Sequence, residues 1–311
     1  MGNEGEERVP EAVALLGFGE AGSSVAAGLR LAPAQPAPRI VAFDPAVRDG
    51  ARARFLRARA QELAVGLHDS PGPWLGEAGL VFSAVPGTQA LAVAQAAKPF
   101  IRPGTVYVDL NTAPPGAKRE AAALVEAAGG AFVDGAVLGS FQADSFRVPI
   151  LLAGHDAERV SRWLLAYGFR VRVMPGGRPG DASAIKLLRS VFMKGLEALC
   201  IECLTAAERA GLRTQVLEAL GDLDSRPIGA TIATLVTSHL RHAPRRLEEV
   251  EIVERMLRQD GFEPILTEAT RRFFDRTVRS GPLWSDPQGP DLDEALGRLL
   301  PVTRAAPVRQ G

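Results

Sequence analysis

Cysteine and lysine are scarce in this chain of 311 residues, and each scarcity carries information. Cys200 and Cys203 are too few for the disulfide framework of a small secreted domain, so we expect a reducing, cytoplasmic setting. No further Cys or His pair at zinc-ligand spacing accompanies them, so the sequence predicts no metal site and two buried structural thiols. Lysine occupies four positions, whereas arginine is elsewhere the basic residue.

An excess of charge of one sign is also lacking, since 36 basic residues balance 36 acidic ones. No global field therefore draws the chain to nucleic acid or to an anionic membrane. The longest uncharged stretch, 78–97, is broken by Pro86 and Gly87, which favours a strand and a helix over a membrane span. Residues 1–10 are polar and acidic, typical of a loose tail rather than a signal peptide. We expect a small-molecule partner, with no nucleic acid and no membrane.

The first half of the chain alternates short β-rich runs with helical patterns, as a parallel sheet with crossover helices requires. The predicted strands cover residues 12–17, 39–44, 80–83, 106–110, 131–134, 150–153 and 170–173. The predicted helices between them cover residues 20–31, 51–64, 88–97, 117–128 and 157–167. This order predicts an α/β Rossmann domain with a doubly wound, mostly parallel sheet.

A cluster of proline and glycine at residues 175–180 separates two kinds of sequence pattern. After this cluster the strand signal stops, and apolar residues recur at intervals of three and four. The predicted helices cover residues 181–210, 213–223, 228–240, 246–259, 263–279 and 291–300. We therefore predict a Rossmann domain over residues 1–179 and an all-α C-terminal domain over residues 180–311.

A glycine-rich turn follows the first predicted strand and opens a helical pattern, which is the context of a dinucleotide-binding fingerprint. Gly17 permits the tight turn, Gly19 lets a pyrophosphate approach the backbone, and Gly22 lets the helix pack closely on the strand. The N-terminus of the helix then faces the phosphates. The predicted cofactor-binding residues of this turn are Gly17, Phe18, Gly19, Glu20, Ala21 and Gly22.

Asp44 ends the second predicted strand, 22 residues beyond Gly22, where an acidic side chain binds the ribose hydroxyls of a dinucleotide. Its carboxylate would repel a 2′-phosphate, so the sequence predicts NAD as the cofactor. The arginines that follow keep NADP possible, although we favour a solvated helix face for them. These arginines are Arg48, Arg52, Arg54, Arg57 and Arg59.

Four further segments, 83–86, 109–115, 134–140 and 180–186, resemble motifs of the β-hydroxyacid dehydrogenase superfamily, which includes 3-hydroxyisobutyrate and 6-phosphogluconate dehydrogenases. The resemblance extends over nearly the whole chain. It implies an NAD(P)-dependent oxidoreductase that transfers a hydride between nicotinamide and a small β-hydroxyacid or a related alcohol or carbonyl compound.

The same resemblance implies which residues line the site. Those beside the cofactor are Ser83, Ala84, Val85, Pro86, Asn111 and Thr112. Those beside the substrate are Asn111, Thr112, Leu138, Gly139, Ser140, Lys186 and Ser190. Asn111 and Leu138 stand where the family motifs have serine, Ser140 where they have glycine, and Ser190 where they have asparagine. Because leucine cannot hydrogen-bond a carboxylate, we expect a substrate that is bulkier, less polar or held differently.

Lys186 aligns with the catalytic lysine of the family, so the resemblance implies that it is the general acid and base. The scarcity of lysine agrees with this role, because a desolvated lysine can lose its proton and an arginine cannot. Ser190 follows one helical turn later on the same face, where its hydroxyl can meet a substrate oxygen. Lys194, two turns beyond Lys186, is a minor candidate.

Two features of the second half concern the substrate and the assembly. His242 and Arg245 stand where we predict a helix end, and they are either solvated cations or contacts for an acidic group of the substrate. Wide apolar stripes such as Ile228, Leu235 and Leu240 exceed what a thin helical layer buries, which predicts a homodimer or higher oligomer.

Two other functions remain open at this point. Imine reductases share the architecture and reduce C=N bonds, but they typically lack a lysine at the position of Lys186, which favours the hydroxyacid hypothesis. A catalytically inactive NAD-binding regulator is the other alternative, because fold does not guarantee function. The departures at Asn111, Leu138 and Ser190 keep that alternative open.

Overall fold

The structure is a computed structural model that describes residues 9–31, 36–48, 50–281, 284–286 and 288–304. It consists of two compact units, residues 1–191 and residues 192–311. The division falls between Val191 and Phe192, inside a helix, whereas the predicted domain boundary precedes that helix. Most of the predicted N-terminal tail, residues 1–8, lies outside the described residues.

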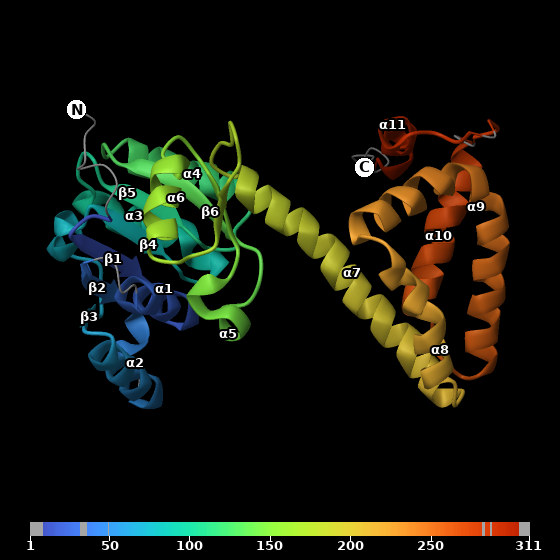
Figure 1. The fold of residues 1–311 in the computed structure, drawn as a ribbon, viewed down its shortest axis with the longest axis horizontal. Helices are drawn as coiled ribbons and strands as arrows, with labels where there is room; N and C mark the ends of the chain where they lie inside the picture. The colour runs from blue at the N-terminus through green and yellow to red at the C-terminus, as the bar shows by residue number, and fades with distance from the viewer. Residues whose placement is uncertain (1–8, 32–35, 49, 282–283, 287, 305–311) are drawn as a thin grey trace, which may run out of the picture. The chain divides into compact units, whose positions relative to one another are not determined.

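Unit 1 contains one eight-stranded sheet. Several of its strands are labelled in Figure 1. Its strands are β1 (Ala12–Leu16), β2 (Arg39–Phe43), β3 (Val65–His68), β4 (Leu80–Ser83), β5 (Val106–Asp109), β6 (Ala131–Val137), β7 (Ile150–Ala153) and β8 (Val171–Val173). They lie in the order β3-β2-β1-β4-β5-β6-β7-β8. Neighbouring strands are parallel except β6 and β7, which are antiparallel. The doubly wound, mostly parallel sheet is therefore confirmed.

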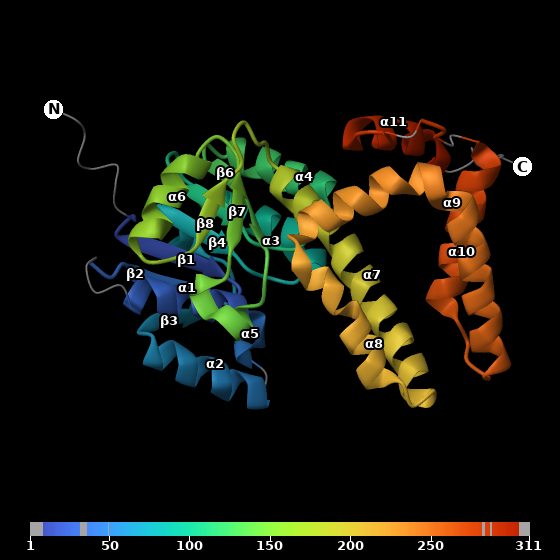
Figure 2. The same cartoon turned by 45° about the vertical axis from the view of Figure 1, so that its right-hand side comes forward.

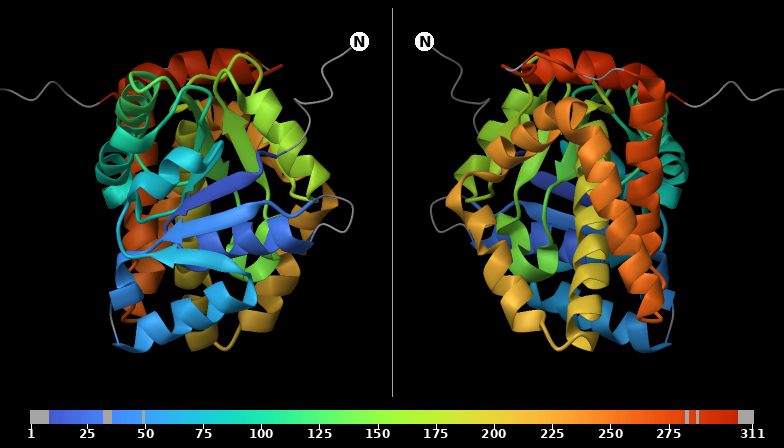
Figure 3. Two further views of the ribbon diagram at one scale, coloured as in Figure 1. Left: turned by 90° about the vertical axis from the view of Figure 1, so that its left-hand side faces the viewer. Right: turned by 90° about the vertical axis from the view of Figure 1, so that its right-hand side faces the viewer.

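Helices cover both faces of this sheet (Figure 3). They are α1 (Glu20–Leu31), α2 (Gly50–Glu62), α3 (Ala90–Ala97), α4 (Pro115–Glu126), α5 (Phe141–Asp144) and α6 (Ala157–Ala166). Successive side chains of β1 enter two separate apolar clusters, Val13 and Leu15 on one face and Ala14 and Leu16 on the other. Burial on both faces explains why central strands such as β1 and β4 are mainly apolar rather than alternating.

The prediction from the sequence missed β3 and α5. Strand β3 is four residues long, includes Gly66 and lies at the edge of the sheet, where only Val65 is buried. An edge strand with one packed side chain carries little apolar signal. Helix α5 is a single turn of four residues, too short for a periodic pattern.

Helix α7 (Asp181–Arg209) begins in unit 1 and ends in unit 2. The remaining helices of unit 2 are α8 (Arg213–Ala219), α9 (Ile228–Gln259), α10 (Ile265–Ser280) and α11 (Leu292–Thr303). No strand occurs among the described residues of this unit, so the all-α second half is confirmed. Helices α9 and α10 lie side by side, as Figure 2 shows.

Helix α9 is one helix where two were predicted, so the expected end near Leu240 is wrong. Pro244 lies inside it and cannot donate the hydrogen bond that the carbonyl oxygen of Leu240 would otherwise accept. The backbone N–H of Trp284 donates to that oxygen at 3.2 Å. A partner from outside the helix thus satisfies the group that the proline leaves unpaired, and the helix continues.

Unit 2 has many exposed apolar side chains. Ile201, Ile228 and Leu235 are 60%, 62% and 58% exposed, whereas Leu240 of the same predicted stripe is fully buried. Cys200 is exposed and Cys203 is partly exposed, so the prediction of two buried thiols is wrong for Cys200. No helix among the described residues is both long enough and apolar enough to span a membrane.

Candidate functional site

The glycine turn after β1 has the geometry that the fingerprint predicts. Gly17 has a φ of +100°, and a Cβ there would lie 2.3 Å from the carbonyl oxygen of Ala84. A Cβ on Gly22 would lie 2.1 Å from the carbonyl oxygen of Gly17. Neither position accepts a larger residue unless the backbone moves. At Gly19, in contrast, a Cβ would have no heavy atom within 4 Å, so the space before α1 is open.

This open space fits a dinucleotide pyrophosphate. The first N–H groups of the 12-residue helix α1 lack partners within the helix, and the helix dipole places partial positive charge there. A phosphate group can therefore approach over Gly19 without meeting a side chain at that position. The residues present thus fit a dinucleotide at this turn.

Asp44 follows β2 and is buried beside the glycine turn. Its Oδ2 accepts a hydrogen bond from the N–H of Phe18 at 3.0 Å, and its Oδ1 accepts one from the N–H of Ala46 at 3.0 Å. An ionised carboxylate offers about four acceptor sites, so about two remain for ribose hydroxyls. The guanidinium of Arg48 pairs with Asp69 at 2.8 Å and holds the pKa of that carboxyl below its usual range.

The loops after β4 and β5 meet at the same edge of the sheet. Asn111 joins them: its Oδ1 accepts from the N–H of Val85 at 2.6 Å, and its Nδ2 donates to the hydroxyl of Ser83 at 2.8 Å. Asn111 is buried, while Pro86 and Thr112 are exposed. The asparagine at this position therefore holds the two loops together, and its contact with cofactor or substrate stays a prediction.

A buried lysine, Lys118 of α4, lies beneath this edge, and the sequence-based prediction missed it. Its Nζ donates to the backbone oxygen of Asp109 at 2.7 Å and pairs with the carboxylates of Asp109 and Asp134 at 3.0 and 3.1 Å. All three side chains are fully buried. A signal was present, because Lys118 shares the helical face of the buried residues Ala121, Ala122 and Val125. A lysine on an apolar face requires a buried partner.

Asp134 also holds the start of α7. Its Oδ2 accepts from the backbone N–H groups of Gly180 and Ser183 at 3.0 and 2.9 Å, and its Oδ1 accepts from the hydroxyl of Ser183 at 2.7 Å. Gly180 has a φ of +98°, and a Cβ there would lie 2.8 Å from the carbonyl oxygen of Pro115. The first turn of α7 is thereby fixed against β6 and α4.

Lys186 lies one turn after Ser183 on α7 and is half-buried. Burial lowers the pKa of its amine, the nearby charge of Lys118 lowers it further, and the charge of Asp134 opposes both. A lysine with a lowered pKa can give and take protons near neutral pH more readily than an exposed one. Ser190, four residues later, is also half-buried.

The segment after β6 supplies the other predicted substrate residues. Leu138 is half-buried and packs against a small cluster that contains Ala136, Ala153 and Ala182, the last of which is on α7. Gly139 and Ser140 are exposed, and the hydroxyl of Ser140 accepts from the N–H of Gln142 at 3.2 Å as the cap of α5. The face of β6 beside α7 is therefore apolar where the family motif has a serine.

His242 and Arg245 belong to unit 2 and lie within α9, not at a helix end as predicted. Arg245 pairs with Glu249 on the same helix at 2.7 Å. Partial burial lowers the pKa of His242, and the neighbouring arginines Arg246, Arg241 and Arg245 lower it further. A contact of either residue with substrate stays a prediction.

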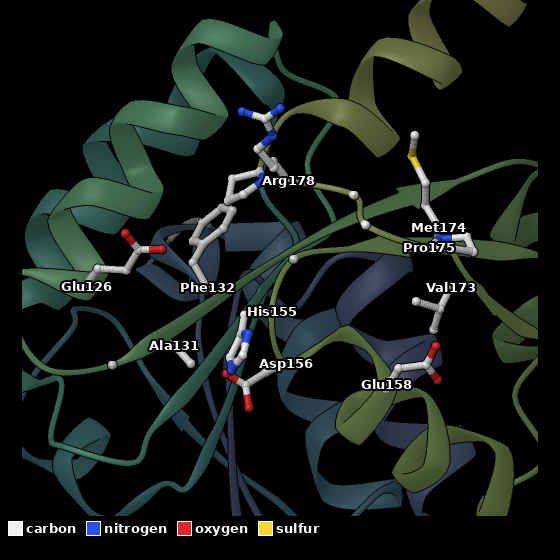
Figure 4. Close-up of a pocket in the computed structure, with 15 residues that line it drawn as sticks. Glu126, Ala131, Phe132, His155, Asp156, Glu158, Val173, Met174, Pro175 and Arg178 are labelled. Atoms are coloured by element: carbon white, nitrogen blue, oxygen red, sulfur yellow. The ribbon is translucent and has the colours of Figure 1, made fainter.

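A pocket of about 650 Å³ lies at the opposite edge of the sheet (Figure 4). It is lined by the first residues of β6 and by the loops that follow β7 and β8. His155, Asp156 and Arg178 are among its polar residues. It does not include the glycine turn or Lys186. No group of three or more His, Cys, Asp or Glu side chains that could hold a metal occurs in the described part of the chain.

Comparisons with known proteins extend over most of the chain. A family model described as "Domain of unknown function (DUF1932)" matches residues 207–277. A conserved hypothetical protein from Sinorhizobium meliloti 1021 is 31% identical, with 97% of this chain and 98% of that chain covered and a TM-score of 0.59. The conserved protein MTH1747, described as of unknown function with structural similarity to 3-hydroxyacid dehydrogenases, is 33% identical, with 86% and 97% covered and a TM-score of 0.57.

A more distant likeness is to a reductive aminase from Aspergillus terreus, whose structure contains NADPH4, cyclohexanone and allyl amine. This enzyme is 17% identical, with 93% of this chain and 99% of that chain covered and a TM-score of 0.71. At this identity the likeness is one of fold. It agrees with the sheet and helix order described above.

Proposed function

Because the chain belongs to the β-hydroxyacid dehydrogenase superfamily, we propose that it is a nicotinamide-dependent oxidoreductase with Lys186 as its general acid and base. The observation that carries the proposal is that the first turn of α7, the helix of Lys186, is hydrogen-bonded to the sheet through Asp134. Asp134, whose carboxylate caps α7, lies opposite Asp109 in the register of the neighbouring strands β6 and β5. Asp109 in turn lies opposite Ser83 of β4. In open α/β sheets, ligands bind at the carboxyl ends of the parallel strands.

The residues of this chain are proposed to move the proton at the substrate oxygen, and the cofactor is proposed to exchange a hydride with the substrate carbon. A nicotinamide dinucleotide held by the glycine turn and Asp44 would supply the hydride for reduction of the substrate carbon and would accept one in oxidation. The ammonium of Lys186 donates a proton to the developing alkoxide oxygen and takes a new proton from solvent. In the reverse direction the neutral amine removes the hydroxyl proton. While charged, the same group stabilises the oxyanion.

The glycine turn, the N-terminus of α1 and Asp44 would bind the dinucleotide. The hydrogen bonds from the N–H groups of Phe18 and Ala46 hold the side chain of Asp44 beside the glycine turn, which supports NAD as the cofactor. The ion pair between Arg48 and Asp69 supports the same choice, since it occupies the arginine nearest to Asp44 along the chain. Ser83, Ala84, Val85, Pro86 and Thr112 complete the proposed cofactor contacts.

The substrate class we propose is a small β-hydroxyacid or the corresponding carbonyl compound, bound beside Lys186 and Ser190. A second candidate is reduction of a C=N bond. The apolar packing of Leu138 favours it, because a substrate wall without a hydroxyl suits an uncharged imine better than a carboxylate. Lys186 favours the first candidate, because imine reductases typically lack a lysine at this position.

The test is a panel of hydroxyacids, their semialdehydes and cyclic imines, assayed with NADH, NADPH and the oxidised cofactors by nicotinamide absorbance. Turnover of a hydroxyacid or semialdehyde supports the proposal, and turnover of imines alone supports the second candidate. Tight dinucleotide binding without turnover of any compound would favour a regulator and overturn both. Lys186→Met in the same assay separates the lysine from the rest of the site.

A further inference from the structure

We propose that the buried ion pair of Lys118 and Asp134 is a positioning element of the site, in which Lys118 holds the carboxylate of Asp134 and Asp134 fixes the helical turn that precedes Lys186. The inference rests on the proposed function, because it gives Lys186 its importance. Neither buried residue is exposed to substrate. Both would act through Lys186.

The burial of these charges is costly for a purely structural element. Lys118, Asp109 and Asp134 form a fully buried cluster of three ionisable groups, and apolar residues of similar shape often stabilise a fold as well or better. Among the described residues, Oδ2 of Asp109 has no hydrogen-bond partner. Burial raises the pKa of Asp109, although Lys118 opposes the shift. Stability alone therefore does not account for the arrangement.

The geometry of Asp134 gives it a positioning role. Helices are usually capped by the residue just before their first turn. Here the cap of α7 comes from β6, a distant part of the chain, and uses both carboxylate oxygens. Lys118 pairs with the Oδ1 that also accepts from Ser183. The ion pair therefore fixes the orientation of the cap, and the cap fixes the helical turn that precedes Lys186.

The charges around Lys186 act in opposite directions. Lys118 of α4 lowers its pKa and Asp134 of β6 raises it, after the lowering by burial itself. Asp109 of β5 faces Lys118, not Lys186. Arg119 of α4 is exposed and lies near Gly180, and Asp181 and Arg189 are charged residues of α7 itself. Removal of Lys118 should therefore raise the pKa of the Lys186 amine, and removal of Asp134 should lower it.

The experiment measures the pH dependence of acylation of Lys186 by a small anhydride in the protein without cofactor, read by peptide mass spectrometry. The neutral amine is the reactive form, so the labelling rate at a fixed pH reports the neutral fraction. Lys118→Met should slow labelling of Lys186 by about threefold or more, and Asp134→Asn should accelerate it by a similar factor. Lys118→Arg, which keeps the charge, should leave the rate close to that of the parent.

Two controls separate this effect from general loosening. Asp109→Asn removes a charge from the same cluster that does not face Lys186, and its labelling rate should be unchanged. Lys194, an exposed lysine of α7 paired with Glu197, is an internal control whose labelling should be equal in every variant. Circular dichroism and thermal unfolding identify any variant that fails to fold, and the Lys118→Arg and Asp109→Asn proteins then carry the comparison.

Rate changes of the same sign in Lys118→Met and Asp134→Asn would overturn the proposal, as would an equal change in Asp109→Asn. The proposal would also be overturned if a folded Lys118→Arg protein showed an altered rate of acylation at Lys186. Labelling needs no turnover, so its result is independent of the proposed oxidoreductase. With a substrate in hand, the pH profile of kcat should move up in Lys118→Met and down in Asp134→Asn.

Discussion

The carboxylate of Asp134 on β6 accepts hydrogen bonds from both the backbone N–H and the hydroxyl of Ser183 on α7, at 2.9 and 2.7 Å. This pair of contacts joins the sheet to the helix that carries Lys186. The same carboxylate binds Lys118, which in turn holds the end of β5. A chain of buried polar contacts thus runs from the strand ends beside the glycine turn to the first turn of α7, the helix that carries the proposed catalytic lysine.

Lys186→Met should lower kcat by about 10² to 10⁴, the usual contribution of general acid–base catalysis, and should leave cofactor affinity within about threefold. Methionine keeps the apolar stem and removes the proton donor. Steady-state kinetics on the best substrate of the panel, with calorimetric titration of the cofactor, provide the measurement. Lys194→Met is the matched control on the same helix, and it should retain full activity. Full kcat in Lys186→Met would show that another group moves the proton.

The parent protein should bind NADH more tightly than NADPH, and Asp44→Asn should reduce that preference by about tenfold. Loss of the carboxylate removes a charged acceptor for the ribose hydroxyls, worth about 1.5–3 kcal/mol, and removes the repulsion of a 2′-phosphate. Calorimetric titration of both cofactors measures the ratio. Asp69→Asn, which releases Arg48, should improve NADPH binding alone. Tighter NADPH binding by the parent would contradict the assignment.

Much of the fold follows from sequence pattern because the strands are buried on both faces. Buried strands such as Leu80–Ser83 and Val106–Asp109, in which only the last residue is strongly polar, are recognisable from the sequence. Strand β3 lacks that signal because it lies at the sheet edge. The continuity of α9 through Pro244 could not be predicted either, since the partner of the Leu240 carbonyl oxygen is the N–H of Trp284, a residue distant in sequence.

The glycine turn was predictable from the sequence because each of its three glycines has a local steric reason. Gly17 and Gly22 leave no room for a Cβ, and Gly19 leaves open space for a ligand. Lys118 illustrates the opposite case. Its place on the apolar face of α4 indicates burial, but its partners Asp109 and Asp134 come from two strands whose register no local pattern reveals. The role of Asn111 in joining two loops depends on contacts of the same kind.

A homodimer or higher oligomer stays a prediction, and the exposed apolar residues of unit 2 support it. Side chains such as Ile201, Ile228 and Leu235 would lose their contact with water against a second copy of the chain. Light scattering at micromolar concentration should give a mass above 33.0 kDa, and Ile201→Glu should shift the distribution towards monomer. Phe55→Glu, an equally drastic change at an exposed position of unit 1, is the control. A stable monomer of the parent protein would contradict the prediction.

Arg245→Ala should raise KM severalfold for an acidic substrate and leave kcat unchanged, if Arg245 binds the acidic group as predicted. In the structure this guanidinium pairs with Glu249 and both side chains are exposed. Glu249→Gln releases the arginine and should not raise KM. An unchanged KM in Arg245→Ala would remove Arg245 from the site, and His242→Ala would then test the remaining candidate.

Glu202 should contribute pH-dependent stability to unit 2. From α7 it accepts hydrogen bonds from the N–H groups of Leu266 and Thr267 at 2.6 and 2.8 Å and from the hydroxyl of Thr267 at 2.7 Å, so it caps α10. Burial alone would raise the pKa of Glu202, but these hydrogen bonds together hold it below its ordinary value of 4.5. Because they favour the ionised form, their contribution is fully present above that value and is lost as the pH falls through the lowered one.

Glu202→Gln should therefore lower the free energy of unfolding by about 1–2 kcal/mol at pH 7, since an amide replaces a charged acceptor of three hydrogen bonds. The difference between parent and variant should shrink as the pH is lowered below about 4, where the parent carboxylate also becomes neutral. Urea unfolding at the two pH values measures it. Glu197→Gln, on the same helix but exposed and paired only with Lys194, should have no measurable effect at either pH. A difference that persists or grows in acid would mean that Glu202 acts through its packing rather than its charge.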